Sequence, residues 1–132
     1  MKGSWSMPVP ATPRILVVDD EEAILYVFER YLSVAGYRVA VANNGFDAVS
    51  AAEAAEADPF DLLITDFRMP GMNGIEVIHA LRRLRPGLPA LVISGNPIEA
   101  GVMPDGVRFL SKPVSMADLL GIIPSLIGRG ID

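Results

Sequence analysis

The sequence predicts an α/β fold in which helices cover both faces of a parallel sheet. Short apolar runs rich in β-branched residues alternate with longer segments whose apolar residues recur at helical spacing. Strands that alternate with helices form βαβ units, and right-handed crossovers place the helices on both faces of the sheet. The chain has 132 residues, of which 51% are hydrophobic, which suits one domain with a substantial core.

Five segments are predicted to be strands. The first is an unbroken apolar run, which is typical of a strand buried on both faces. The expected strands span 14–19, 37–42, 61–66, 90–94 and 107–111.

Four segments are predicted to be helices, at 22–36, 44–57, 74–84 and 116–127, the last weakened by Gly121 and Pro124. In the first, the residues at helical spacing are Ile24, Leu25, Phe28, Tyr31, Leu32 and Ala35. In the third, we expect Ile75, Ile78 and Leu81 to be buried and His79 to be solvated.

The connection between the fourth and fifth strands departs from this regularity. It contains Pro97, Gly101, Pro104 and Gly106, which interrupt a helix. We therefore expect a helix of at most two turns or an irregular loop. Contacts with partners would then depend more on the first helix and the loops near it.

The ends and the composition narrow the possible functions. Residues 1–13 contain three prolines and no periodicity, so we read them as a tail, linker or expression remnant that precedes a domain at 14–128. The formal net charge of -5 argues against direct nucleic-acid binding. The chain has no cysteine, no apolar run long enough to span a membrane and no apolar stretch behind Lys2, so we expect a cytoplasmic protein.

Polar residues end four of the five predicted strands. They are Asp19-Asp20-Glu21, Asp66, Ser94-Gly95 and Ser111-Lys112-Pro113. Because parallel strands share a direction, these ends should meet at one edge of the sheet, where ligand sites of such folds lie. Clustered carboxylates repel one another unless a cation joins them, and oxygen ligands without histidine or cysteine favour Mg²⁺.

A metal, a lysine, a hydroxyl donor and a spare carboxylate together suit phosphoryl transfer, with Asp66 as the nucleophile. Each residue alone has an ordinary explanation, since Asp20 or Asp66 can cap a helix and Lys112 can be a solvated surface lysine. Four complementary strand ends are harder to explain as four separate caps.

At this point the sequence resembles a known family. The segments "ILVVDDE", "LLITDFRMPGMNG", "LVISG" and "FLSKP" are similar, in order and approximate spacing, to the response-regulator receiver domain of two-component signalling, over about 14–127. The resemblance implies a flavodoxin-like sheet with strand order 2-1-3-4-5. It also implies a phosphoacceptor in a phosphorelay, which receives phosphate from a histidine kinase or phosphotransfer protein and switches a surface for an output partner.

The resemblance also implies roles for individual residues. The implied Mg²⁺ ligands are Asp20, Asp66, the backbone carbonyl of Arg68 and, through water, Asp19. The implied phosphorylation and switch residues are Asp66 as phosphoacceptor, Lys112 as phosphate-binding lysine, Ser94 as switch hydroxyl and Phe109 as switch aromatic. A cis peptide bond between Lys112 and Pro113 is expected as well.

Other functions remain open at this stage. A degenerate receiver would act as a constitutive interaction module, although every acid of the site is present. A hydrolase with an aspartyl-phosphate intermediate usually has an Asp-x-Asp pattern at its first strand, which Asp19-Asp20-Glu21 does not match. A flavodoxin-like nucleotide-binding protein is disfavoured because no glycine-rich loop follows the first strand. We expect a phosphoacceptor that can assist its own phosphorylation and dephosphorylation, and not an enzyme. The chain is expected to be a stand-alone receiver, the terminal receiver of a hybrid kinase or an excised piece of a longer protein.

Overall fold

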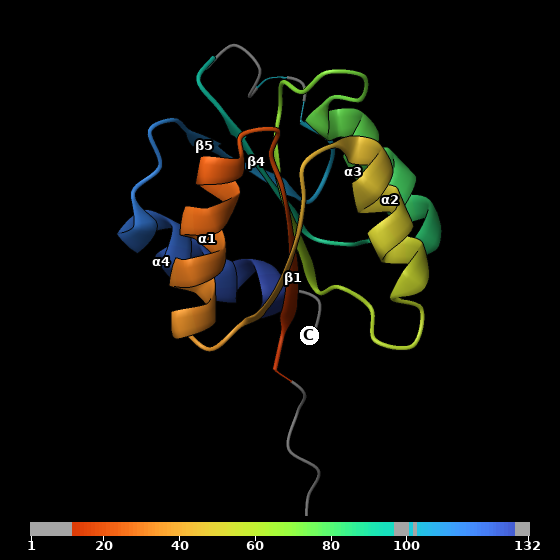
Figure 1. Ribbon diagram of the computed structural model, residues 1–132, viewed down its shortest axis with the longest axis horizontal. Coiled ribbons are helices and arrows are strands. Elements are labelled where there is room, and N and C mark those ends of the chain that lie inside the picture. Colours follow the sequence, from red (N-terminus) through yellow and green to blue (C-terminus); the bar gives the residue numbers. More distant parts are fainter. Residues whose placement is uncertain (1–11, 97–100, 102, 129–132) are drawn as a thin grey trace, which may run out of the picture.

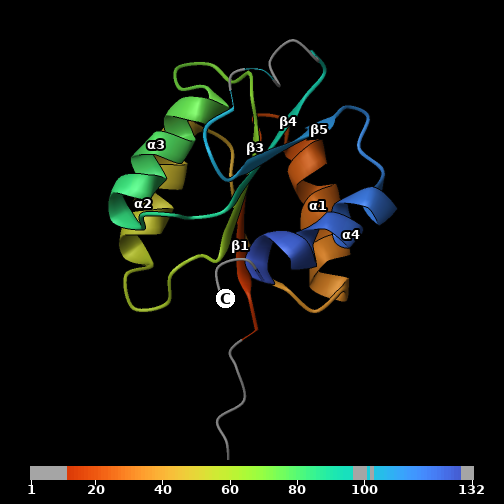
Figure 2. The same cartoon turned by 180° about the vertical axis from the view of Figure 1, so that it is seen from behind.

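A computed structural model describes residues 12–96, 101 and 103–128. It contains one parallel sheet of five strands in the order β2-β1-β3-β4-β5, which confirms the predicted fold and strand order. Helices α1 and α4 cover one face of the sheet, and α2 and α3 cover the other (Figures 1 and 2). None of the described helices has both the length and the apolar character needed to cross a membrane.

The observed elements lie close to the predicted ones. The strands are β1 (Arg14–Val18), β2 (Arg38–Ala42), β3 (Leu62–Asp66), β4 (Ala90–Ser94) and β5 (Val107–Ser111). The helices are α1 (Glu22–Val34), α2 (Gly45–Ala54), α3 (Gly74–Leu84) and α4 (Met116–Gly128). The predictions for α1 and α2 were too long at their carboxyl ends, and α4 continues through Pro124.

The core has two halves, one on each face of the sheet. Leu16 and Val18 face α2 and α3, whereas Ile15 and Val17 face α1 and α4. This alternation follows from the two-residue period of a strand. Since β1, β3 and β4 are buried on both sides, their apolar runs are continuous.

Two predicted helix faces need correction. In α1 the buried residues are Leu25, Phe28 and Leu32, whereas Tyr31 is 52% exposed. Tyr31 precedes Leu32 by about 100° around the helix, which turns it away from the sheet. Ala35 is exposed at the C-cap, beyond the last helical residue.

In α3, Ile78 and Leu81 are buried as predicted, and His79 is exposed as predicted. Ile75 is only partly buried. Val77, which the prediction omitted, is fully buried. The buried face of α3 is therefore wider than the three residues predicted from their spacing.

The predicted short helix after β4 falls on residues 97–100 and 102, which lie outside the described residues. The described flanks, 95–96 and 103–106, carry no helix. Arg82 of α3 ties the second flank to the core, because its side chain donates to the carbonyl oxygens of Leu88 (3.0 Å) and Asp105 (2.9 Å).

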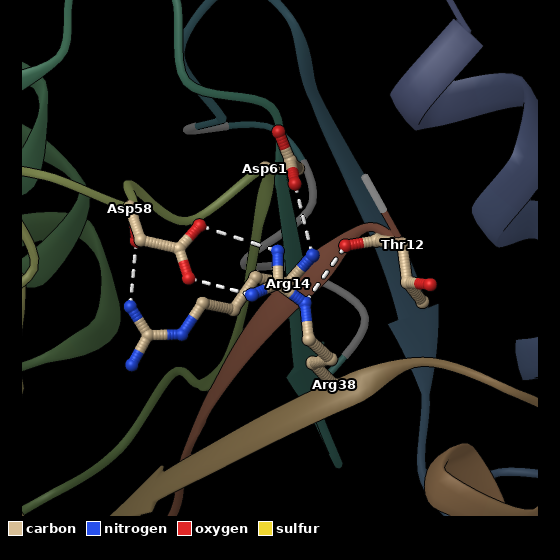
Figure 3. Close-up of polar contacts among 5 residues, drawn as sticks. All are labelled: Thr12, Arg14, Arg38, Asp58 and Asp61. Carbon is tan, nitrogen blue, oxygen red and sulfur yellow. Dashed lines mark hydrogen bonds and ion pairs between the residues drawn. The ribbon is translucent and has the colours of Figure 1, made fainter. Parts of the chain in front are cut away.

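The edge at which β1, β2 and β3 begin carries paired charges (Figure 3). The Arg38 guanidinium donates to the Asp58 carboxylate and to the carbonyl oxygen of Thr12. The Arg14 side chain donates to the Asp58 carbonyl oxygen at 2.6 Å, and its backbone N–H donates to the Asp61 carboxylate at 2.9 Å. The carboxylates of Asp58 and Asp61 therefore each accept a hydrogen bond from an arginine residue.

Candidate functional site

Three carboxylates meet at the opposite edge, where the strands end. Val18 is in register with Thr65, so the residues that follow them, Asp19 and Asp66, leave adjacent strands at the same level. Asp20 comes next along the chain, and one carboxylate oxygen from each of the three acids lies within 4.8 Å of the others. The parallel topology thus brings Asp66 to the adjacent pair Asp19 and Asp20, from which it is separated by at least 46 positions along the chain.

None of these acids serves as a helix cap. The N-cap residue of α1 is Glu21, which makes no side-chain cap hydrogen bond, and the N-cap of α3 is Asn73. Asp19 instead accepts a hydrogen bond from the backbone N–H of Glu21 at 2.9 Å. The capping explanation for Asp20 and Asp66 is therefore wrong.

Burial disfavours the charged form of two acids of this cluster. Asp19 is 4% exposed, and burial raises the pKa of its carboxyl to about 6, with the charges of Asp66 and Asp20 adding to the rise. Burial also raises the pKa of Asp66, although Lys112 opposes this rise. Each raised pKa means that the carboxylate form is disfavoured by its environment.

Lys112 faces this cluster with a positive charge. Its Nζ lies 3.2 Å from Oδ1 of Asp66. Burial lowers the pKa of Lys112, but the attraction of the Asp66 carboxylate and the hydrogen bond to it outweigh this, so the pKa is raised. The ammonium group therefore stays charged at neutral pH.

The donor set fits a hard divalent cation. All three side chains offer carboxylate oxygens, which Mg²⁺ and Ca²⁺ prefer, and the raised pKa values of Asp19 and Asp66 show that positive charge would stabilise them. The cluster can hold a metal ion.

The predicted hydroxyl lies beside this cluster. Ser94 ends β4 and is 2% exposed, and its neighbour Ile93 is in register with Asp66. The Ser94 carbonyl oxygen accepts from the backbone N–H of Lys112 at 2.9 Å, and its Oγ accepts from the backbone N–H of Asn96 at 3.1 Å. All four strand ends singled out in the sequence therefore meet at one edge.

Two further expectations concern β5 and the loop after it. Phe109 is in register with Val92 and packs, half-buried, against the core that α2 and α3 cover. The peptide bond between Lys112 and Pro113 is cis, as the resemblance implied.

The loop from β3 to α3 is closed tightly at its base. The backbone N–H of Gly74 donates to the carbonyl oxygen of Phe67 at 2.8 Å. A Cβ on Gly74 would lie 2.5 Å from the Asp66 carbonyl oxygen, so only glycine fits there. The loop in between carries Arg68, whose backbone carbonyl was the implied ligand.

The start of α3 is also fixed by a capping box that the sequence reasoning missed. Asn73 accepts from the backbone N–H of Glu76, and the Glu76 carboxylate accepts from that of Asn73, both at 2.9 Å. The signal was present in the sequence as Asn-x-x-Glu before an apolar run. A second missed contact, from Thr65 Oγ1 to the Asp66 carbonyl oxygen at 2.9 Å, had no such signal.

The strand order, the acidic edge and its lysine define the class: a flavodoxin-like signalling fold of the receiver type. The family model described as "Response regulator receiver domain" matches residues 15–124, and the chain belongs to this family. It is thus a receiver domain of the response regulators of two-component systems, which work with histidine kinases and output partners.

Relatives of known name agree with this assignment. The transcriptional regulatory protein PrrA of Mycobacterium tuberculosis is 34% identical over 122 residues, which cover 89% of this chain and 51% of that protein. The response regulator MprA of Mycobacterium leprae is 37% identical over 120 residues, covering 88% of this chain and 51% of that protein. The chain therefore spans about half the length of these curated relatives.

Solved structures show the same fold. A response regulator receiver domain protein from Clostridium thermocellum matches with a TM-score of 0.82 and 26% identity, over 89% of this chain and 96% of that one. The receiver domain of the hybrid histidine kinase CckA matches with a TM-score of 0.76 and 34% identity, over 86% of this chain and 98% of that one.

Proposed function

We propose that this domain accepts a phosphoryl group on Asp66, with Mg²⁺, from the phosphohistidine of a histidine kinase or phosphotransfer protein. The observation that carries the proposal is the juxtaposition of three carboxylates at one sheet edge with Lys112 at 3.2 Å from Asp66. We further propose that the domain is a non-enzymatic phosphoacceptor that acts in the cytoplasm.

Asp20 and Asp66 would hold the metal directly, together with the backbone carbonyl of Arg68, and Asp19 would act through water. When bound, Mg²⁺ neutralises negative charge on the oxygens of the transferring phosphoryl group. An Asp66 carboxylate oxygen forms a bond to phosphorus while the bond from phosphorus to the donor nitrogen breaks. Lys112 adds positive charge beside that carboxylate.

The proposed switch links this chemistry to β4 and β5. Phosphorylation adds charge and acceptor oxygens at Asp66, to which the Ser94 hydroxyl can move and donate. This movement vacates space into which the Phe109 ring turns, so that two local states bias a partner surface. Phe109 lacks the hydroxyl of tyrosine and should occupy the inward state more readily. A ring position that stays the same on phosphorylation, measured by aromatic NMR, would contradict this model.

For the phosphodonor we propose a docking surface on α1. Val27, Tyr31 and Val34 follow one another at spacings of four and three residues, so they form one stripe, and they are 39, 52 and 84% exposed. Beside this stripe lies a groove of about 440 Å³, which apolar residues of α1 and of the segment before α4 line together with Asp19, Glu21 and Lys112. A partner that covers the stripe would therefore reach the site edge.

Labelling with acetyl phosphate tests the proposal. The wild type should incorporate one phosphoryl group per chain, only with Mg²⁺, and Asp66→Asn should incorporate none, because an amide is not a competent nucleophile. Asp61→Asn is the matched control, since Asp61 lies just before the same strand at its opposite end and its partner there, the Arg14 backbone N–H, also bonds an amide oxygen.

The two alternatives give different results in this assay. Repeated turnover of phosphodonors would favour a hydrolase. A wild type that takes no label would favour a constitutive interaction module. Labelling of Asp66→Asn at the wild-type level would refute Asp66 as the acceptor.

A further inference from the structure

The first turn of α2 is packed directly against the loop between β3 and α3. A Cβ built on Gly45 would lie 2.7 Å from Sδ, 2.8 Å from Cβ and 3.0 Å from Cγ of Met72. The Phe46 ring covers Gly71, because a Cβ built there would lie 3.2 Å from Cε2 of that ring. These two contacts join α2 to the loop that carries Arg68.

Position 45 requires glycine because a Cβ there would clash with Met72, and not because of its backbone conformation. Gly45 is the first residue of α2, and its φ lies outside the left-handed region, so alanine can adopt the same conformation. The thioether end of Met72 could swing aside, but its Cβ moves only with the backbone. An alanine at 45 must therefore displace the loop backbone around Met72.

Both sides of this contact are held in place. Asn44 caps α2 by accepting from the backbone N–H of Asp47 at 2.8 Å, which fixes the first turn. The loop is closed at its base by the bond from Gly74 to Phe67. Because the two ends of the loop are held, a displacement of Met72 should also move the loop residues between Phe67 and Met72, which include Arg68.

We infer that Gly45 and Phe46 are positioning residues for the metal site, which act through Met72 and Gly71 on the loop that supplies the Arg68 carbonyl. The inference rests on the proposed function, because it assumes that Mg²⁺ binds at the carboxylate cluster. It assigns to α2 a role in metal affinity although α2 contributes no ligand.

The test is the Mg²⁺ dissociation constant, obtained from the rise in the urea midpoint with Mg²⁺ concentration. Gly45→Ala should weaken Mg²⁺ binding about tenfold, as is common when the support of a metal ligand is lost. The matched control is Gly121→Ala, another helical glycine. A Cβ built there meets nothing within 4 Å outside its own stretch of helix, and the Mg²⁺ affinity of this variant should equal that of the wild type.

A double-mutant cycle separates positioning from general destabilisation. Met72→Gly removes all three atoms that a Cβ at position 45 would meet. In that background Gly45→Ala should have no further effect on Mg²⁺ affinity. An equal loss in both backgrounds would overturn the inference, because the contact with Met72 would not be the cause.

If Gly45→Ala does not fold, Phe46→Ala tests the same positioning role. Phe46 is 61% exposed, so its loss should affect folding little, but it frees Gly71 and should weaken Mg²⁺ binding severalfold. Tyr26→Ala, at 62% exposure on α1, is its control and should leave the affinity unchanged. A Phe46→Ala variant with wild-type affinity would overturn the inference.

Failure of the inference and failure of the proposed function give different results. If the wild type itself shows no Mg²⁺-dependent stabilisation, the proposed function fails and the inference fails with it. If the wild type binds Mg²⁺ and Gly45→Ala and Phe46→Ala bind it equally well, only the inference fails.

Discussion

Replacing Asp19 by asparagine should stabilise the metal-free protein at neutral pH. Asp19 is buried beside two other acids, and its carboxylate is disfavoured in the folded state. Asparagine has nearly the same shape, carries no charge and keeps an oxygen that can accept the hydrogen bond from the Glu21 backbone N–H. The substitution therefore removes the charge and little else.

The magnitude follows from the pKa. Burial raises the Asp19 pKa from 3.8 to about 6. Each pKa unit corresponds to about 1.36 kcal/mol, so the ionised carboxylate destabilises the folded state by about 3 kcal/mol. Because the folded pKa lies above the unfolded one, this penalty is complete above pH 6, about half remains at pH 5, and it vanishes below 3.8.

Urea unfolding in EDTA measures this effect. Asp19→Asn should be more stable than the wild type by about 3 kcal/mol at pH 7.5 and by about half of that at pH 5. Asp118→Asn is the control: Asp118 lies exposed in the first turn of α4, so its loss should destabilise by less than about 1 kcal/mol. In saturating Mg²⁺ the advantage of Asp19→Asn should shrink or reverse, since a bound metal stabilises the wild type more.

Two results would refute this reasoning. A metal-free Asp19→Asn that is less stable than the wild type at pH 7.5 would show that the carboxylate is not under electrostatic strain. A stabilisation that is the same at pH 7.5 and pH 5 would show that it arises from packing and not from charge.

Three further substitutions test other parts of the site. Gly74→Ala should lower the free energy of unfolding by about 1–3 kcal/mol in urea, since its Cβ would lie 2.5 Å from the Asp66 carbonyl oxygen; wild-type stability would contradict that contact. Asn73→Ala should cost about 1 kcal/mol in the same assay, and no loss would mean that the capping box contributes nothing. Lys112→Ala should keep Mg²⁺ binding but lose the phosphorylation-dependent NMR shifts of Phe109, and normal shifts would count against its role.

The residues at the edge of the site could be predicted because the local sequence pattern marks where each strand ends and indicates a parallel sheet. Apolar runs mark the strands, and the parallel arrangement then places Asp19, Asp66, Ser94 and Lys112 at one edge without any knowledge of packing.

Side-chain packing between distant segments was not predictable in the same way. Tyr31 has helical spacing with buried residues, yet the sheet reaches only a narrower face of α1. The contact between Gly45 and Met72 depends on the distance between a helix end and a loop 27 positions later in the chain, which no local pattern encodes. The burial of Val77 similarly depends on how α3 sits against α2 and the sheet.

The most direct test of the central claim is to locate the phosphoryl group on the wild-type chain. After incubation with acetyl phosphate and Mg²⁺, borohydride reduction of the acyl phosphate marks the modified residue, and peptide mass spectrometry identifies it. We expect one mark per chain, on Asp66, that is absent when EDTA replaces Mg²⁺. A mark on Asp19 or Asp20, or an Asp66 mark that forms equally well without metal, would contradict it.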